Sequence, residues 1–316
     1  MIPLISIIMA CYNEKLEWIE QSIESILNQT YRNIEFIVVC DNPKNYELKQ
    51  MLLKYKEKDK RIKVILNEKN LGLIKSLNTA LVECNGQYIA RMDADDVSHL
   101  DRIDKQVSFL ERNKNIDLVM SYANTIDESG KKIGKKKLSP VKTDKIKNTL
   151  KTRNISVHPT WMFRSNILVD LKGYNEVKYV EDYEFLCRCI TQGYSINTIP
   201  EILLDYRIRR DSVCNSNRLL QQANFQIVNK FYKQILKYGG IISKEYLENE
   251  INKCNLSKFQ NNVDKAKQLI NSNKYIKGYI LLFWLYANSS LKRRQLLNEI
   301  FYKAYHIKIR VLKEEY

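Results

Sequence analysis

Apolar and polar residues follow two different periodicities along the first hundred residues. Four short runs are almost wholly apolar and rich in β-branched residues, which is typical of strands buried on both faces of a parallel sheet. They cover residues 5–10, 34–39, 62–66 and 88–92. The segments between them place an apolar residue at every third or fourth position, as amphipathic helices do. They cover residues 16–27, 44–58 and 74–84. This alternation of strand and helix predicts an α/β fold with a mostly parallel sheet flanked by helices.

The pattern becomes mixed after residue 100. The expected helices are 100–111, 144–150 and 180–192. The expected strands are 117–122, 157–163, 194–199 and 202–208, with a turn or hairpin at 128–134. Beyond Ser216 strands disappear and apolar residues keep a helical period. We therefore expect a domain over residues 1–216, with halves of about 1–113 and 114–216, and an α-helical C-terminal extension over 217–316.

The charge of the chain is strongly basic and unevenly distributed. Of a net charge of +16, residues 213–316 contribute +11, from 18 Lys and Arg against 7 Asp and Glu. A basic segment points to a polyanionic partner such as nucleic acid, anionic lipid or a phosphate-bearing substrate, although a solvated helical surface has the same composition. An apolar run at 279–286 followed by Lys292, Arg293 and Arg294 favours peripheral contact with an anionic membrane, or alternatively a core helix.

The expected location is the cytoplasm, including the inner face of the cell membrane. Seven cysteines, odd in number and scattered, favour a reducing compartment. No window offers 18 uncharged apolar residues, so no transmembrane span is expected. The first residues lack a basic region before the apolar run, and we interpret them as the first strand rather than a signal peptide.

The strand at 88–92 runs directly into three carboxylates, Asp93, Asp95 and Asp96. Like charges this close resist burial unless a cation or a set of donors neutralises them, and oxygen ligands suit Mg²⁺ or Mn²⁺. The alternative is a solvated acidic turn. In a parallel sheet, however, all strands end at one edge, where ligands bind. Tyr12, Asn13, Asp41 and Asn42 follow the first two strands, so the same edge should hold them, which favours a metal site.

Several of these segments, taken in order, resemble family 2 glycosyltransferases, which have the GT-A nucleotide-diphospho-sugar transferase fold. The resemblance covers residues 3–216 and rests above all on Asp93-Ala94-Asp95-Asp96 and on Glu181-Asp182. The matching segments are 5–13, 25–31, 70–72 with Asn78, 88–96, 101–106, 158–160 and 181–184, followed by Tyr206 and Arg207.

The resemblance implies an inverting transferase that moves a sugar from a nucleotide-diphosphate donor, most often UDP-linked, to a saccharide or lipid-linked saccharide. It implies Mn²⁺ or Mg²⁺ as cofactor and a role in capsule, O-antigen or another cell-surface polysaccharide. Asp182 would be the general base, Asp95 the metal ligand, and Asp93 a ribose contact or second metal ligand. The other implied donor-site residues are Ala10, Tyr12, Asn13, Asp41, Asn70, Arg91 and Ala94, and those on the acceptor side are His158, Trp161 and Glu181.

Two positions depart from the family pattern. Cys40 stands where most members have the first of two aspartates, and Arg209 stands where many have a histidine. The second difference implies that Arg209 contacts phosphate directly.

Two other functions are considered. A sugar-phosphate nucleotidyltransferase also combines an α/β sheet with acidic metal ligands, but it needs a glycine-rich basic loop after the first strand, where this chain has Cys11-Tyr12-Asn13-Glu14. A nucleic-acid-binding protein would fit the pI of about 9.3, but the basic residues form no recognised motif, and no nucleic-acid partner is expected.

Overall fold

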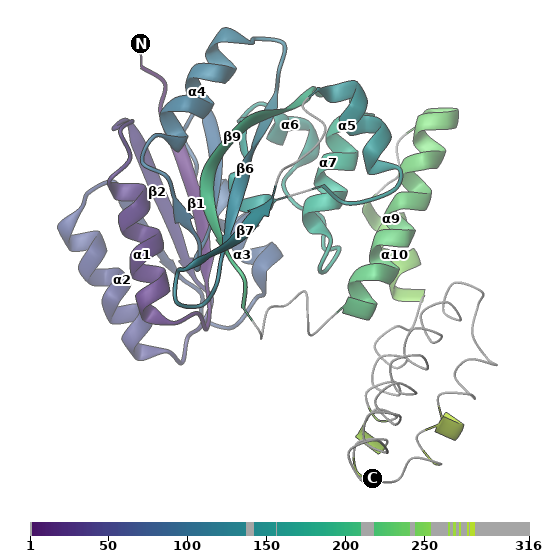
Figure 1. The fold of residues 1–316 in the computed structure, drawn as a ribbon, viewed down its shortest axis with the longest axis horizontal. Coiled ribbons are helices and arrows are strands. Elements are labelled where there is room, and N and C mark those ends of the chain that lie inside the picture. The colour runs from purple at the N-terminus through teal and green to yellow at the C-terminus, as the bar shows by residue number, and fades with distance from the viewer. Residues whose placement is uncertain are drawn as a thin grey trace.

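The computed structural model describes residues 2–136, 142–155, 157–209, 218–240 and 244–253, together with isolated positions between 265 and 281 (Figure 1). Ser216, Cys214, Cys254 and the basic residues 292–294 lie outside the described residues, as does most of the apolar run at 279–286. Within the described part, no helix is long and apolar enough to cross a membrane.

The described strands form one mixed sheet in the order β3-β2-β1-β4-β8-β6-β9-β5, with β7 paired to β6 outside this path. The strands are β1 (Ile5–Cys11), β2 (Ile34–Cys40), β3 (Ile62–Leu66), β4 (Tyr88–Asp93), β5 (Val97–Ser98), β6 (Leu118–Ile126), β7 (Lys132–Lys136), β8 (Met162–Arg164) and β9 (Ile196–Arg207). The first four are parallel, as predicted, whereas β8 is antiparallel to both β4 and β6.

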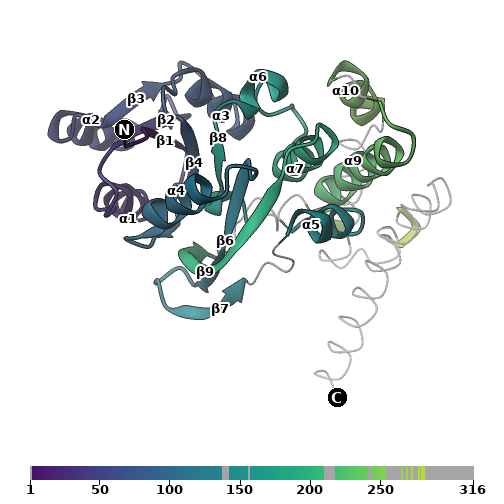
Figure 2. The same ribbon diagram turned by 90° about the horizontal axis from the view of Figure 1, so that it is seen from above.

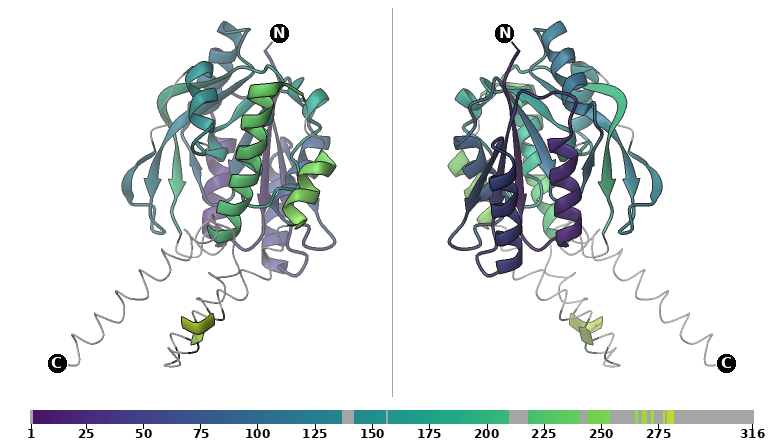
Figure 3. Two further views of the ribbon diagram at one scale, coloured as in Figure 1. Left: turned by 90° about the vertical axis from the view of Figure 1, so that its right-hand side faces the viewer. Right: turned by 90° about the vertical axis from the view of Figure 1, so that its left-hand side faces the viewer.

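Helices cover both faces of this sheet (Figure 2). They are α1 (Leu16–Leu27), α2 (Tyr46–Lys58), α3 (Leu73–Val82), α4 (Arg102–Arg112), α5 (Thr143–Leu150), α6 (Ile167–Leu171), α7 (Glu181–Thr191), α9 (Arg218–Tyr238) and α10 (Lys244–Lys253). The predicted helices up to α7 are confirmed to within about two residues at each end. Helices α9 and α10 lie on the flank opposite α1 and α2 (Figure 3).

The apolar face predicted for the start of the C-terminal extension packs on the domain. Val228, Phe231 and Tyr232 of α9 are buried, and α9 contacts α7. Asn229 donates from Nδ2 to the hydroxyl of Tyr183 on α7 at 2.7 Å. The buried apolar side chains of α9 continue the hydrophobic core of the domain, and this hydrogen bond joins α9 to α7.

Two strand predictions were wrong. Residues 157–163 do not form one strand, because His158–Thr160 is a short 3₁₀ turn (η1) containing Pro159, and only Met162–Arg164 pairs as β8. Proline lacks the N–H that a strand needs for its ladder. Conversely, 194–199 and 202–208 are one strand, β9, whose register against β6 shifts at Ser121 and Tyr122, opposite Pro200 and Glu201. A β-bulge accommodates Pro200, which cannot donate a ladder hydrogen bond, and β9 continues beyond it.

Gly86 lets β4 begin beside β1. A Cβ atom at this position would lie 2.5 Å from the backbone nitrogen of Ser6. The Gly86 N–H instead donates to the Ser6 hydroxyl at 2.8 Å. This close approach aligns Ala10 at the end of β1 with Asp93 at the end of β4.

Candidate active site

The site lies where the order of the parallel strands reverses. Chain order runs outward from β1 to β3, and β4 then pairs with the free edge of β1. In open α/β sheets the crevice at such a switch point, outside the carboxyl ends of the strands, is the place where ligands bind. Here it brings together the residues after β1, β2 and β4, as the sequence predicted.

Asp41, which follows β2, is buried and holds the loop that precedes α3. Its Oδ1 accepts hydrogen bonds from Asn67 Nδ2 and from the Leu71 backbone N–H, and its Oδ2 accepts one from Gly72 N–H, each at 2.8 Å. Gly72 has φ 82°, a conformation that glycine adopts at little cost. The carboxylate therefore fixes the loop around Asn70 at one wall of the crevice.

A second set of bonds ties the loop after β1 to the loop after β2. Asn42 Nδ2 donates to Asn13 Oδ1 at 2.6 Å and to the Tyr12 carbonyl at 3.3 Å. The side chains of Tyr12 and Asn13 are exposed, and so is Asn70 on the neighbouring loop. These three side chains are exposed at the sheet edge where a ligand is expected, and their contact with one stays a prediction.

The acidic turn after β4 carries carboxylates in three environments. Asp93 is partly exposed and pairs with the buried guanidinium of Arg91. Asp95 pairs with Arg209, with Oδ2 3.0 Å from Nε. Asp96 is buried, its Oδ1 accepts the Arg207 N–H at 2.8 Å, and its Oδ2 has no hydrogen-bond partner among the described residues. The turn thus presents Asp93 and Asp95 to the crevice and keeps Asp96 behind them.

Arg207 joins this turn to neighbouring elements. Its Nε donates to the Asp95 carbonyl at 2.7 Å and its Nη2 to Gln21 Oε1 at 2.9 Å. Its Nη1 reaches the carbonyls of Asp127 and Glu128 at 3.2 and 3.3 Å. A buried arginine at the end of β9 therefore sets the backbone position of the acidic turn.

Burial and crowded negative charge raise the pKa values of Asp95 and Asp96. Burial and the neighbouring Asp93 raise the pKa of Asp95 to about 7, against the opposing effect of Arg209. Burial, together with Asp95 and Asp93, raises the pKa of Asp96 well above its ordinary range. A bound cation would relieve this repulsion.

The donor atoms fit a divalent cation only in part. Asp93 and Asp95 supply carboxylate oxygens, the ligands that Mg²⁺ and Mn²⁺ prefer. Within the described ranges, however, no three His, Cys, Asp or Glu side chains lie close enough to hold a metal ion. A cation here would need further oxygen ligands from a bound molecule.

Helix α7 begins with two carboxylates in different surroundings, and Asp93 is close enough to Glu181 to raise its pKa. Glu181 is 9% exposed, and burial together with Asp182 raises its pKa to about 8. Asp182 is half-buried, accepts the Tyr183 N–H at 2.6 Å, and lies 3.3 Å from Asn154 Nδ2 through both oxygens. Hydrogen bonds to a carboxylate favour its charged form, which is the form that a general base needs.

The aromatic residues predicted on the acceptor side are buried. His158 Nε2 lies 2.8 Å from the Tyr174 hydroxyl, and its ring centroid lies 4.5 Å from that of Trp161. Trp161 is fully buried. Burial and the nearby Arg91 lower the pKa of His158 well below its ordinary value, so its imidazole is neutral. Both rings form the wall behind the cleft, and a direct contact of either with an acceptor stays a prediction.

Sequence reasoning missed two contributors to this site. Asn67 follows β3 at the same sheet edge as Asp41, and this position after a predicted strand could have identified it as a site residue. Asn154, the partner of Asp182, lies in an irregular loop that carries no pattern. Only the packing of this loop beside α7 brings the two side chains together.

We expect replacement of Glu181 by glutamine to change how stability depends on pH. The folded carboxyl group keeps its proton up to a pKa of about 8, whereas in the unfolded chain it ionises near 4.5. The contribution of Glu181 to the unfolding free energy is therefore greatest below pH 4.5. It falls as the pH rises from 4.5 to 8, by as much as about 1.4 kcal/mol per pH unit. Urea unfolding at pH 5, 6.5 and 8 should show the Glu181→Gln variant gaining stability relative to the native protein as pH rises. If the unfolding free energies of the variant and the native protein changed with pH in parallel, this expectation would be wrong. The control is Glu47→Gln on the exposed face of α2.

A parallel sheet that reverses at β1, an acidic turn at the end of β4 and a carboxylate pair at the start of α7 are the arrangement expected of a glycosyltransferase of the GT-A class. Comparison with known proteins agrees. The sequence model described as Glycosyl transferase family 2 matches residues 6–171. The chain belongs to this family.

Two curated relatives and two solved structures illustrate the relationship. An uncharacterised glycosyltransferase of Methanocaldococcus jannaschii is 42% identical over 206 residues, covering 65% of this chain and 71% of the relative. The O-antigen biosynthesis glycosyltransferase WbnJ of Escherichia coli is 32% identical over 236 residues, covering 74% and 91%.

TarS 1–349 of S. aureus, solved with UDP, superposes with a TM-score of 0.58 at 18% identity, covering 77% of this chain and 68% of that chain. The mannosyltransferase PcManGT of Pyrobaculum calidifontis, solved with GDP-Man and Mn²⁺, has a TM-score of 0.56 at 17% identity, covering 98% and 83%. At these identities the two structures establish the shared fold alone. The match to the family model and the relatives named as glycosyltransferases identify the chain as a glycosyltransferase rather than a sugar-phosphate nucleotidyltransferase.

Proposed function

We propose that this protein is an inverting, metal-dependent glycosyltransferase that moves a sugar from a UDP-sugar to a saccharide hydroxyl. The observation that carries the proposal is the placement of Asp93 and Asp95 at the switch point of the sheet, close enough to the start of α7 that the charge of Asp93 raises the pKa of Glu181, the neighbour of Asp182. Charge on the leaving diphosphate and the proton on the attacking hydroxyl then have separate partners.

The donor nucleotide would lie over the ends of β1 and β2. Exposed Tyr12 and Asn13 can contact the base, and Ala10 lines the pocket below them. Asp41 already accepts three hydrogen bonds within the chain, so its main contribution is a rigid loop at 70–72 against which the nucleotide rests. The TarS structure contains UDP and shares this fold, which supports a UDP-linked donor.

The diphosphate would lie against the acidic turn. Asp95, with Asp93 beside it, would hold a divalent cation, and the structure of PcManGT with Mn²⁺ supports metal use on this fold. Such a cation, when bound, neutralises the charge that develops on the leaving diphosphate. Arg209, 3.0 Å from Asp95, stands where it can contact a phosphate oxygen.

On the acceptor side, Asp182 would take the proton from the hydroxyl that attacks the anomeric carbon. Glu181, with a pKa of about 8, keeps its own proton at neutral pH and cannot serve as the base there. Attack by the hydroxyl opposite the leaving diphosphate is a single displacement, which inverts the anomeric configuration. Relatives that act in O-antigen and amylovoran biosynthesis suggest a cell-surface polysaccharide as the acceptor.

A donor-hydrolysis screen tests this function. The purified protein is incubated with UDP-, dTDP- and GDP-sugars, in Mn²⁺ and in EDTA, and the released nucleoside diphosphate is measured. We expect release from UDP-sugars in Mn²⁺ and a loss of at least about tenfold on chelation. Equal release in EDTA would refute metal dependence. A preference for another nucleotide would refute the UDP-sugar assignment but would leave the assignment to the glycosyltransferase family unchanged.

A further inference from the structure

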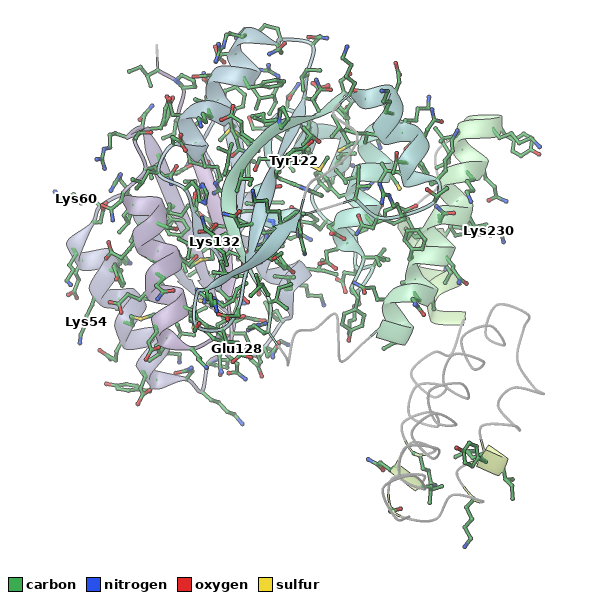
Figure 4. All side chains as sticks on the ribbon, viewed as in Figure 1. Lys54, Lys60, Tyr122, Glu128, Lys132 and Lys230 are labelled. Atoms are coloured by element: carbon green, nitrogen blue, oxygen red, sulfur yellow. The ribbon has the colours of Figure 1, made fainter. Side chains whose placement is uncertain are left out.

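The hairpin formed by β6 and β7 stands outside the main order of the sheet. β7 pairs with β6 on one side, and no other described strand pairs with it. Lys131, Lys132, Ile133 and Lys135 are exposed along it (Figure 4 labels Lys132 and, at the turn, Glu128). Among the described strands, the second edge of β7 is therefore unpaired and lies at the surface of the protein.

Positive charge is concentrated along this edge. Residues 131–136 contain Lys131, Lys132, Lys135 and Lys136 and no acidic residue. The two acids at the turn have partners: Asp127 Oδ1 accepts the N–H groups of Ser129 and Lys131, and Glu128 lies 3.6 Å from Lys15. No ion pair among the described residues involves Lys131, Lys132 or Lys135.

An apolar side chain lies among these lysines. Ile133 is 56% exposed at the centre of the run. Lysines on an edge strand commonly serve to prevent sheet-to-sheet aggregation, and an exposed isoleucine works against that purpose. Basic residues around an exposed apolar residue are instead the combination that binds an anionic bilayer, where the lysines meet headgroups and the apolar side chain enters the interface.

The hairpin also adjoins the catalytic crevice. The carbonyls of Asp127 and Glu128 at its turn accept hydrogen bonds from Arg207, which also bonds the Asp95 carbonyl. A surface bound to the β7 edge would hence lie next to the acidic turn. An acceptor anchored in that surface would reach the crevice over a short distance.

We propose that the β7 edge, residues 131–136, docks the enzyme on an anionic phospholipid surface. The partner is the negatively charged headgroup layer, with Ile133 entering the interface. This docking is independent of the donor and of the mechanism proposed above. It is also distinct from any contact made by the C-terminal extension.

Vesicle co-sedimentation of the full chain tests the proposal. Neutral phosphatidylcholine vesicles are compared with vesicles containing phosphatidylglycerol, at 50 mM and 500 mM salt. We expect binding to the anionic vesicles at low salt and its loss at high salt, because exposed charges are screened. Failure to bind, or equal binding to neutral vesicles, would overturn the proposal.

Two variants locate the binding surface. Each lysine near an anionic surface strengthens binding by about fivefold, so Lys131→Gln, Lys132→Gln and Lys135→Gln together should weaken binding at least about tenfold. The matched control replaces Lys54, Lys56 and Lys60, exposed lysines on the α2 side of the molecule (Figure 4 labels Lys54 and Lys60), and should bind as the native chain does. An equal loss in both variants, or none in the first, would refute the assignment to β7.

A third variant and a competitor complete the test. Ile133→Ser should weaken vesicle binding while leaving the salt dependence unchanged. Soluble heparin serves as a polyanion without a surface. If heparin binds as tightly as the vesicles and Ile133→Ser has no effect, the edge is a site for a soluble polyanion, and the membrane proposal fails.

Discussion

Replacing Asp182 by asparagine should lower kcat for sugar transfer about a thousandfold while donor affinity stays within about twofold. Asparagine keeps the shape of the side chain and can still accept the Tyr183 N–H that Asp182 accepts at 2.6 Å. What it loses is the capacity to take a proton, and a positioned general base contributes about 10² to 10⁴ in rate. Steady-state kinetics with a saccharide acceptor, combined with calorimetric titration of the donor, separates the two effects.

The control for this variant is Asp144→Asn, an exposed carboxylate in the first turn of α5, which should retain full activity. Glu181→Gln gives the sharper comparison, since Glu181 is adjacent but keeps its proton at neutral pH. We expect it to retain far more activity than Asp182→Asn at pH 7. If the two variants were equally inactive, or if Asp182→Asn lost donor binding, the assignment of the base would be wrong.

Replacing Asp95 by asparagine should remove most of the metal-dependent donor affinity and lower activity by about 10² to 10³, the usual effect of losing one electrostatic partner of the transition state. Asp95 lies 3.0 Å from Arg209, and burial beside Asp93 raises its pKa to about 7. Donor binding is measured by titration calorimetry in Mn²⁺ and in EDTA. We expect the native protein to bind more tightly in Mn²⁺ and the variant to bind equally weakly in both.

The same substitution tests Arg209 as the source of positive charge. Asparagine would remove the negative charge that Arg209 pairs with at this position, and the arginine could then contact the diphosphate. If Arg209 supplied the needed charge in place of a metal, Asp95→Asn would bind the donor more tightly in EDTA than the native chain does. Asp101→Asn is the matched control, because this half-buried carboxylate lies just beyond the acidic turn and pairs with Lys105, and the variant should behave as the native protein.

The nucleotide half of the fold was predictable from local pattern. β1 to β4 are short, apolar and separated by helices of clear periodicity, and each of these signals is contained within a window of about ten residues. Parallel pairing and the handedness of the crossovers then place Tyr12, Asp41 and Asp95 at one edge without further information. The acidic turn could be located for the same reason.

The second half was less predictable, because its elements depend on partners far away in sequence. Residues 157–163 have the composition of a strand, yet β8 has only three residues, since Pro159 breaks the ladder and Arg102 and Gln106 of α4 bond the carbonyls of η1. β9 continues past Pro200 because its pairing with β6 on both sides of the bulge compensates for the missing N–H.

Sequence alone determined the fold class, the order of the first four strands and which aspartates follow the carboxyl ends of these strands, because these follow from periodicity and from the rules of parallel sheets. Tertiary structure decided the environment of each carboxylate. Asp95 lies beside Arg209, Asp96 is buried behind it, and burial lets Glu181 keep its proton at neutral pH. Burial and charge at a side chain are sums over neighbours from distant segments, and no local pattern contains them.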